Sequence, residues 1–227
     1  MWSRLTREPG VLRLRNGLRY WIRPQASDRA SITEILMLSP YSLPPNGSVV
    51  VDIGANIGAW SIPASRLAKV VYAVEPIAGN FDMLARNCEL NEAANVIPIQ
   101  LAISHTSGPA EMSVNGVMSS LVWCQPGKEM ESVTTLSLDR LLDQYRIERV
   151  DFLKMDCEGA EWEILLNAPA SLFERIGRME LEYHVVKGMQ PKLLLDRLEG
   201  VGFRTSVSGD CSTGIIKAAR PPGAGGV

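Results

Sequence analysis

The stretch VVVDIGANIGAW at residues 49–60 limits the possible folds of this chain more than any other. It opens with the β-branched run Val49 to Val51, which is typical of a strand buried on both faces, and passes through Asp52 into a glycine turn. Gly54 and Gly58 can adopt positive φ and carry no Cβ. The stretch therefore predicts a strand followed by a loop whose bare backbone lies close to a ligand.

A second predicted strand, residues 70–74, ends in Glu75 and Pro76. A carboxylate at the carboxyl edge of a parallel sheet can accept both hydroxyls of a ribose, so Glu75 predicts a nucleoside pocket. A dinucleotide loop needs the pattern G-x-G-x-x-G, but Asn56 and Ala59 stand at its second and third glycine positions. An amide there suits a ligand without pyrophosphate that ends in an amino acid, such as S-adenosylmethionine. The alternative is a glycine turn that only closes a strand-to-helix connection.

The composition limits the class of protein. A chain of 227 residues with 46% hydrophobic content can bury one sizeable core, so we expect one main domain. Its formal net charge of −2 argues against holding nucleic acid by phosphate neutralisation alone. Seven arginines crowd the first thirty residues, which favours a solvated hairpin face; a local anionic contact is the alternative.

The four cysteines form no C-x-x-C pair, and there are two histidines, which argues against a zinc cluster. We expect free thiols in a reducing compartment. No apolar run is long enough for a membrane span, and the N-terminus lacks the apolar core of a signal peptide. These features predict a cytoplasmic protein with no membrane partner. Assembly into a homo-oligomer stays open.

From Val49 onward, strand and helix patterns alternate, which predicts an α/β fold with a doubly wound, mostly parallel sheet. The expected strands are 49–53, 70–74, 96–103, 150–155 and 179–184. The expected helices are 57–68, 80–90, 138–145, 160–167 and 191–199. An antiparallel hairpin at 203–207 and 214–218 closes the sheet, and 104–132 is irregular with short strands of its own.

The segment before the first core strand predicts an accessory unit. VLRLRNGLRYWIR at 11–23 alternates apolar and basic residues around Asn16-Gly17, a strong hairpin signal, and a short helix follows at 31–37. We expect residues 1–45 to form a lid or edge addition and residues 46–218 to form the ligand-binding domain. The tail at 219–227, rich in proline and glycine, predicts disorder.

A second group of polar residues follows the strand at 150–155. Asp156 and Glu158 come at the carboxyl edge where ligands of open α/β sheets bind. Acidic residues there favour a hydroxyl acceptor that loses its proton to a base or through a divalent ion. His184 ends the fifth strand near the same edge and competes with Asp156 as the base. For Glu158 and Glu161, the alternative is capping of the next helix.

On these motifs the chain resembles the FkbM-type methyltransferases, from about residue 11 to 207. The most specific match is DFLKMDCEGAEWEIL at 151–165. The other matching stretches are VVVDIGANIGAWS at 49–61, VYAVEP at 71–76, NFDMLARNCELN at 80–91, LAIS at 101–104, SSL at 119–121, TTLSLDRLL at 134–142 and MELEYH at 179–184. Cys157 departs from the family, which has an aliphatic residue there.

The resemblance implies a class I, Rossmann-like fold that binds S-adenosylmethionine and methylates hydroxyls of sugars, lipids or natural products. It implies these cofactor contacts: Asp52, Gly54, Asn56 and Gly58 to the methionine part, Glu75 with Pro76 to the ribose, and Ala102 and Ile103 to the adenine. Asp156 and Glu158 would face the methyl group and the acceptor, with His184 as the third catalytic candidate. No residue is assigned as a metal ligand, and a divalent metal is the less favoured alternative.

Three alternatives stay open at this point: an RNA methyltransferase, an NAD-dependent oxidoreductase and a protein that binds S-adenosylmethionine without catalysis. RNA methylation would need a basic surface around the pocket. A dehydrogenase would bind NAD in place of S-adenosylhomocysteine. A non-catalytic protein would bind S-adenosylhomocysteine and show no turnover.

Overall fold

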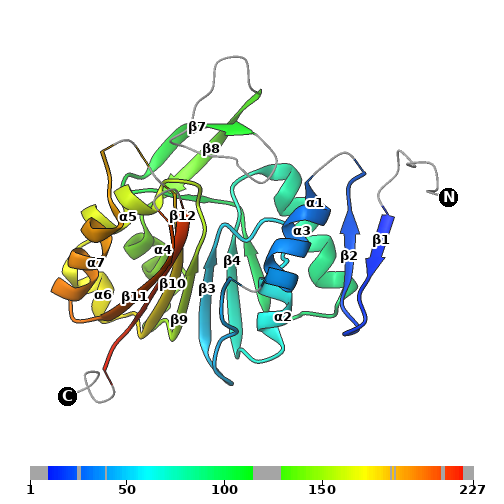
Figure 1. Cartoon of the computed structure of the whole chain (residues 1–227). Coiled ribbons are helices and arrows are strands. Elements are labelled where there is room, and N and C mark those ends of the chain that lie inside the picture. Colours follow the sequence, from blue (N-terminus) through cyan, green and yellow to red (C-terminus); the bar gives the residue numbers. More distant parts are fainter. Residues whose placement is uncertain are drawn as a thin grey trace.

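A computed structural model describes residues 10–24, 27–38, 40–114, 129–184, 186, 188–210 and 213–221. Its centre is a seven-stranded sheet in the order β11-β12-β10-β9-β3-β4-β5 (Figure 1). The bounds are β3 Val49–Ile53, β4 Val70–Val74, β5 Val96–Ile99, β9 Phe152–Met155, β10 Arg178–His184, β11 Arg204–Gly209 and β12 Thr213–Ala219. Strands β5, β4, β3, β9 and β10 run parallel, and β12 and β11 add the antiparallel end. The predicted α/β class and closing hairpin are confirmed.

Helices cover both faces of this sheet because successive strand residues point to opposite sides. Val50 and Phe152 belong to a buried cluster with the residues of α2 (Ser61–Ser65) and α3 (Ala78–Leu90). Val51 and Leu153 belong to a second cluster, which includes residues of α4 (Leu138–Gln144), α5 (Glu161–Asn167), α6 (Ala170–Glu174) and α7 (Pro191–Gly200). Polar and apolar residues do not alternate at 49–53 and 152–155 because both faces of these strands are buried.

The strand order reverses at β3. The next strand along the chain, β4, lies on one side of β3, whereas β9 lies on the other. In open α/β sheets a ligand binds at this reversal, outside the carboxyl ends of the strands. Asp52 pairs in register with Ala73 on one side and Lys154 on the other, so Gly54, Glu75 and Asp156 follow three adjacent strand ends.

Two predicted elements are wrong in length. The helix expected at 57–68 is only α2, Ser61–Ser65, because Asn56 and Gly58 hold the chain at φ of 50° and 87°, outside the helical region. The strand expected at 96–103 breaks after β5, where the amide of Leu101 turns back to the carbonyl of Ile99. The last two residues of the expected strand form β6 (Ala102–Ile103), which belongs to a different sheet. Helix α6 was not predicted.

That second sheet has three strands in the order β6-β8-β7 and stands above the carboxyl edge (Figure 1). Strand β7 (Gly108–Val114) pairs antiparallel with β8 (Glu129–Leu136), and β6 pairs parallel with β8. The region expected to be irregular therefore holds two longer strands. Residues 115–128, between them, lie outside the described part of the chain.

The predicted N-terminal hairpin is confirmed as β1 (Gly10–Arg13) and β2 (Arg19–Ile22). The short helix begins at Asp28, three residues before its expected start: α1 (Asp28–Thr33) continues as the π-helical turn η1 (Glu34–Leu38). Buried residues of the hairpin, such as Tyr20, belong to the same cluster as α3. The front segment therefore shares its core with the sheet, and Figure 1 shows it beside α3.

The predicted disordered tail is wrong for its first two residues. Ala219 ends β12, and the Arg220 guanidinium donates hydrogen bonds to the carbonyls of Phe173 and Ile176. Residues 222–227 lie outside the described part. Cys88 and Cys157 are free thiols, as expected, while Cys124 and Cys211 fall outside it. Among the described helices, none is both long and apolar enough to cross a membrane.

Candidate active site

A cavity of about 370 Å³ opens at the carboxyl edge of the central sheet. Its wall is built where four parallel strands end: Gly54 follows β3, Glu75 follows β4, Asp156 follows β9, and His184 is the last residue of β10. The cavity therefore lies where the strand order reverses, the position expected for a ligand of an open α/β sheet.

Most of the predicted site residues line this one cavity. They are Gly54, Asn56, Glu75, Pro76, Ala102, Ile103, Asp156, Glu158 and His184. Ala102 and Ile103 form an apolar wall together with Leu101 and Met112. The front segment contributes Ser31, Glu34 and Ile35, which were not expected. The contacts of these residues with a cofactor stay predictions.

Asp52 and Gly58 do not line the cavity. A Cβ on Gly58 would come within 2.9 Å of Leu84 Cδ1 and 3.1 Å of Ile62 Cδ1, so its smallness serves helix packing. Asp52 is fully buried and accepts a hydrogen bond from Ser61 Oγ. Neither residue is placed for the direct ligand contact that the resemblance implied.

The reason for glycine at position 54 also differs from the expected one. A Cβ there would lie 1.8 Å from the backbone oxygen of Asp156, and the φ of Gly54 is +78°. Glycine is required because the ends of β3 and β9 meet at this point, and not only because a ligand approaches. The amides of Gly54 and Ala55 both donate to the carbonyl of Val74, which fixes the loop between the strands.

Glu75 is almost completely buried and holds the glycine loop against the next helix. Its Oε2 accepts the Asn56 amide at 2.9 Å, and its Oε1 accepts the Ile77 amide at 3.1 Å and Asn80 Nδ2 at 3.3 Å. Burial raises the pKa of Glu75 to about 7, although these hydrogen bonds oppose the rise. Glu75 lines the cavity, and its contact with a ribose stays a prediction.

Lys154 is a site residue that sequence reasoning missed. Its Nζ lies 3.1 Å from Asp52 Oδ1, 3.1 Å from the Gly54 carbonyl and 3.8 Å from Asp156 Oδ2. Burial alone would lower the pKa of Lys154, but Asp52 and Asp156 outweigh burial and raise it. The ammonium thus connects two strand ends in the wall of the cavity. The sequence feature that could have identified it is a lysine within FLKM, an otherwise apolar pattern typical of a buried strand.

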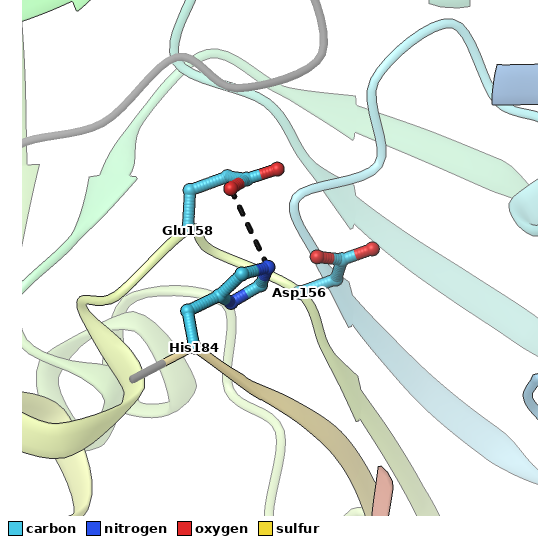
Figure 2. A group of neighbouring side chains, drawn as sticks. All are labelled: Asp156, Glu158 and His184. Carbon is cyan, nitrogen blue, oxygen red and sulfur yellow. Dashed lines mark ion pairs between the residues drawn. The ribbon is translucent and has the colours of Figure 1, made fainter. Parts of the chain in front are cut away.

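Asp156, Glu158 and His184 converge on one space from the loop after β9 and the end of β10 (Figure 2). His184 Nε2 lies 3.4 Å from Glu158 Oε2 and 4.0 Å from Glu182 Oε1. Glu158 adopts φ of +51°, a rare backbone conformation for a side chain with a Cβ, and Gly159 follows at +97°. This turn is what aims Glu158 back at the histidine.

The pKa values of Glu158, Glu182 and His184 are all raised. Burial raises the pKa of Glu158 to about 7, against the opposing effect of His184. Burial would lower the pKa of His184, but the hydrogen bond to Glu161 and the charges of Glu161, Glu158 and Asp156 raise it to about 9. Burial and the nearby Asp156 also raise the pKa of Glu182. Displaced pKa values in a cavity are typical of a catalytic site.

Asp156, Glu158 and His184 bring ligand atoms within 4.8 Å of one another, a spacing that a divalent cation can bridge. At neutral pH, however, the imidazolium of His184 already supplies a positive charge between these carboxylates. A metal would have to displace that proton. The cluster can therefore take part in acid and base chemistry without a metal.

Comparison with known proteins agrees with this architecture. A crystal structure of the methyltransferase FkbM from Methylobacillus flagellatus superposes with a TM-score of 0.54 at 16% identity, over 82% of this chain and 47% of that one. A precorrin-6y C5,15-methyltransferase from Geobacter metallireducens gives 0.51 at 17% identity, over 85% and 87%. These likenesses define the fold as that of the class I methyltransferases.

The family model of the methyltransferase FkbM domain matches residues 52–205, and the chain belongs to this family. Methyltransferase sdnD of Sordaria araneosa is 29% identical over 70% of this chain and 74% of its own length. The hexuronic acid methyltransferase AglP of Haloferax volcanii is 26% identical over 70% of this chain. The match spans 65% of the length of AglP.

Proposed function

We propose that this protein transfers the methyl group of S-adenosylmethionine to a hydroxyl of a small molecule, such as a sugar, a lipid or a natural product. One observation carries the proposal: a single cavity is lined both by Glu75, the residue we expect to contact the ribose, and by the Asp156–Glu158–His184 cluster. Family membership supports the methyl transfer, and the acids support an oxygen acceptor that must lose a proton.

The sulfonium carries its own driving force, so the protein's task is to align the acceptor oxygen with the methyl carbon and to exclude water. The C–O bond forms as the C–S bond breaks, its electron pair stays on sulfur, and the hydroxyl proton passes to a carboxylate. His184, with its pKa raised to about 9, is an imidazolium at neutral pH and cannot accept that proton. We assign the base to Glu158, with Asp156 as the alternative carboxylate.

The cavity wall also limits the charge of the acceptor. Among the described residues that line it, five carry carboxyl groups and two are basic, Lys154 and His184; the five are Glu34, Glu75, Asp156, Glu158 and Glu182. Like charges across a binding surface cost affinity. We therefore expect a neutral or cationic acceptor in preference to a uronate such as the substrate class in the name of AglP. The same wall argues against RNA, which needs a basic surface.

The test begins with cofactor binding, measured by calorimetry with S-adenosylhomocysteine. Glu75→Gln should weaken binding by roughly 10- to 100-fold, because a buried charged hydrogen bond to the ribose is worth about 1.5–3 kcal/mol. Glu89→Gln, an exposed position on α3, should leave binding unchanged. Equal affinity of both variants would refute the assignment of Glu75. Binding of NAD without S-adenosylhomocysteine would refute the methyltransferase.

Activity is then measured with a methyl-labelled donor on neutral sugars, uronates and bulk RNA. Label in the neutral sugars alone supports the proposal, and label in RNA or only in uronates contradicts it. Binding without transfer to any acceptor, both in the wild type and in Glu158→Gln, would favour a non-catalytic binding protein. The reaction should persist after exhaustive chelation, because the proposed base requires no metal.

A further inference from the structure

Glu161 lies fully buried beneath the cavity, although the sequence favoured it as a helix cap. Its Oε1 accepts the backbone N–H of His184 at 2.6 Å and faces His184 Nδ1 at 3.3 Å. Its Oε2 accepts the Gly159 amide at 2.9 Å and lies 3.7 Å from Cys157 Sγ. Every one of these contacts is with a donor. The carboxylate therefore joins the loop after β9 to the end of β10.

These contacts fix the ring of His184. A carboxylate can only accept, so the contact with Glu161 places a proton on Nδ1 of the imidazole. The backbone is held from the other side, because Trp162 Nε1 donates to the carbonyl of His184 at 2.7 Å. Nε2 is thereby directed into the cavity, toward Glu158 at 3.4 Å (Figure 2).

A helix cap would satisfy the free N–H groups of its own first turn. Glu161 does not do this: the amide it accepts, that of Gly159, precedes the helix, and its other oxygen reaches a strand 23 residues further along the chain. Burying such a carboxylate is costly unless it is paired, and His184 supplies the pairing. The position of Glu161 is thus explained by the histidine more than by the helix.

We propose that Glu161 is a positioning residue: it holds His184 with Nδ1 protonated and Nε2 facing Glu158, and so controls the protonation state of the catalytic carboxylate. The inference rests on the proposed function for its catalytic meaning. In the reaction, the acceptor proton moves to the Glu158 carboxylate while His184 keeps both of its protons and donates Nε2–H to that carboxylate. The proton on Glu158 then leaves to solvent.

Other charged groups also face this pair. Asp156 and Glu158 approach from the loop after β9, and Glu182 approaches from β10. Lys154 neutralises part of the charge of Asp156, and Tyr41 donates to Glu182 Oε2 at 3.1 Å. Glu161 is distinguished from these groups because, within the described part of the chain, it is the carboxylate placed against Nδ1.

The chain contains a matched control for this pair. Glu163 is two residues away on the same helix, and its Oε2 lies 3.3 Å from Nδ1 of His105, the other histidine. Both side chains of that pair are substantially exposed, at 41% and 32%, so solvent screens their interaction. Glu163→Gln therefore removes the same charge from the same helix without touching His184.

The test is ¹⁵N NMR of histidine-labelled protein, with His105→Asn used to assign the two imidazoles. In the wild type, Nδ1 of His184 should stay protonated across the titration, and its midpoint should lie well above 6.5. Glu161→Gln should lower that midpoint by more than one pH unit. Glu163→Gln should not move it. A midpoint in Glu161→Gln within 0.2 unit of the wild type would overturn the proposal.

If Glu161→Gln does not fold, the NMR spectrum of the wild-type protein still tests the proposal. A neutral His184 that carries its proton on Nε2 would contradict the proposed arrangement. Kinetics separate positioning from structure: Glu161→Gln should shift the pH profile of kcat/KM and keep the S-adenosylhomocysteine affinity within twofold. An unshifted profile in a folded, cofactor-binding variant would overturn the catalytic role. The NMR result does not depend on turnover, so failure of the methyltransferase assignment would be recognised separately.

Discussion

Gly54 shows how the absence of one Cβ lets two strand ends meet. Position 54 combines a left-handed backbone with direct contact to Asp156, whereas Gly47 has nearly the same φ, +75°, and no atom within 4 Å of its missing Cβ. Alanine substitutions at these two positions therefore distinguish the cost of backbone strain from the cost of steric overlap. At Gly47 we expect only strain, and at Gly54 both effects.

Gly47→Ala should cost about 1–2 kcal/mol of the free energy of unfolding, the typical penalty of a left-handed residue with a Cβ. Gly54→Ala should cost more than about 4 kcal/mol or prevent folding, because the overlap at 1.8 Å is with rigid backbone. Urea denaturation of both variants measures the difference. Similar losses in the two would show that the strand ends separate easily.

At the scale of elements, two asparagines of α3 attach the N-terminal hairpin to the domain. Asn87 Oδ1 accepts the amide of Trp21 at 2.6 Å, and its Nδ2 donates to the carbonyl of Ile57 at 2.9 Å. Asn91 Oδ1 accepts the amide of Arg19 at 2.9 Å. Asn87 therefore joins the hairpin, the helix and the glycine loop in one buried contact.

Asn87→Ala should lower the free energy of unfolding by about 2–4 kcal/mol, since it leaves the half-buried Trp21 amide and the buried Ile57 carbonyl without the Asn87 side chain. The Trp21 amide should also exchange its hydrogen faster. Asn167→Ala, which removes an exposed hydrogen bond to the Glu163 carbonyl, should change stability by less than about 0.5 kcal/mol. Unchanged exchange at Trp21 would mean that the hairpin is held by its apolar contacts alone.

For the whole molecule, the displaced pKa values predict how stability depends on pH. The pKa of His184 is raised from 6.5 to about 9, so its contribution is complete below pH 6.5 and is lost as the pH rises through 9. Glu75 and Glu158, raised from 4.5 to about 7, have the same sign: their contributions are present below pH 4.5 and are lost through pH 7. Stability of the ligand-free protein should therefore fall from pH 5 to 9.

Thermal unfolding at constant ionic strength checks this trend. Between pH 7 and 9 the fall in Tm should come mainly from His184, so His184→Asn should flatten that part of the curve. His105→Asn should leave the slope as in the wild type, because His105 is substantially exposed. A Tm that rises over this range in the wild type would contradict the raised pKa of His184.

Much of the fold could be predicted because local patterns of apolar and turn-forming residues indicate the strands and helices. Strands β3 and β4 have the expected bounds, since an apolar run followed by a turn is a property of neighbouring residues. The same reasoning placed Glu75, Asp156, Glu158 and His184 at one edge, because parallel strands bring their carboxyl ends together. It failed for α2, where Gly58 adopts a left-handed φ to pack against α3.

The order of the elements, the sheet edge that carries the polar residues and the family resemblance can all be inferred from the amino-acid sequence, since all three follow from spacing along the chain. The bridge from Lys154 to Asp52 and Asp156, and the contact of Glu161 with His184, are seen in the folded structure alone. Residues 23 or 102 positions apart meet only through strand pairing and register. No local sequence pattern predicts which buried charged residues will pair, because their pairing depends on the packing of the whole sheet.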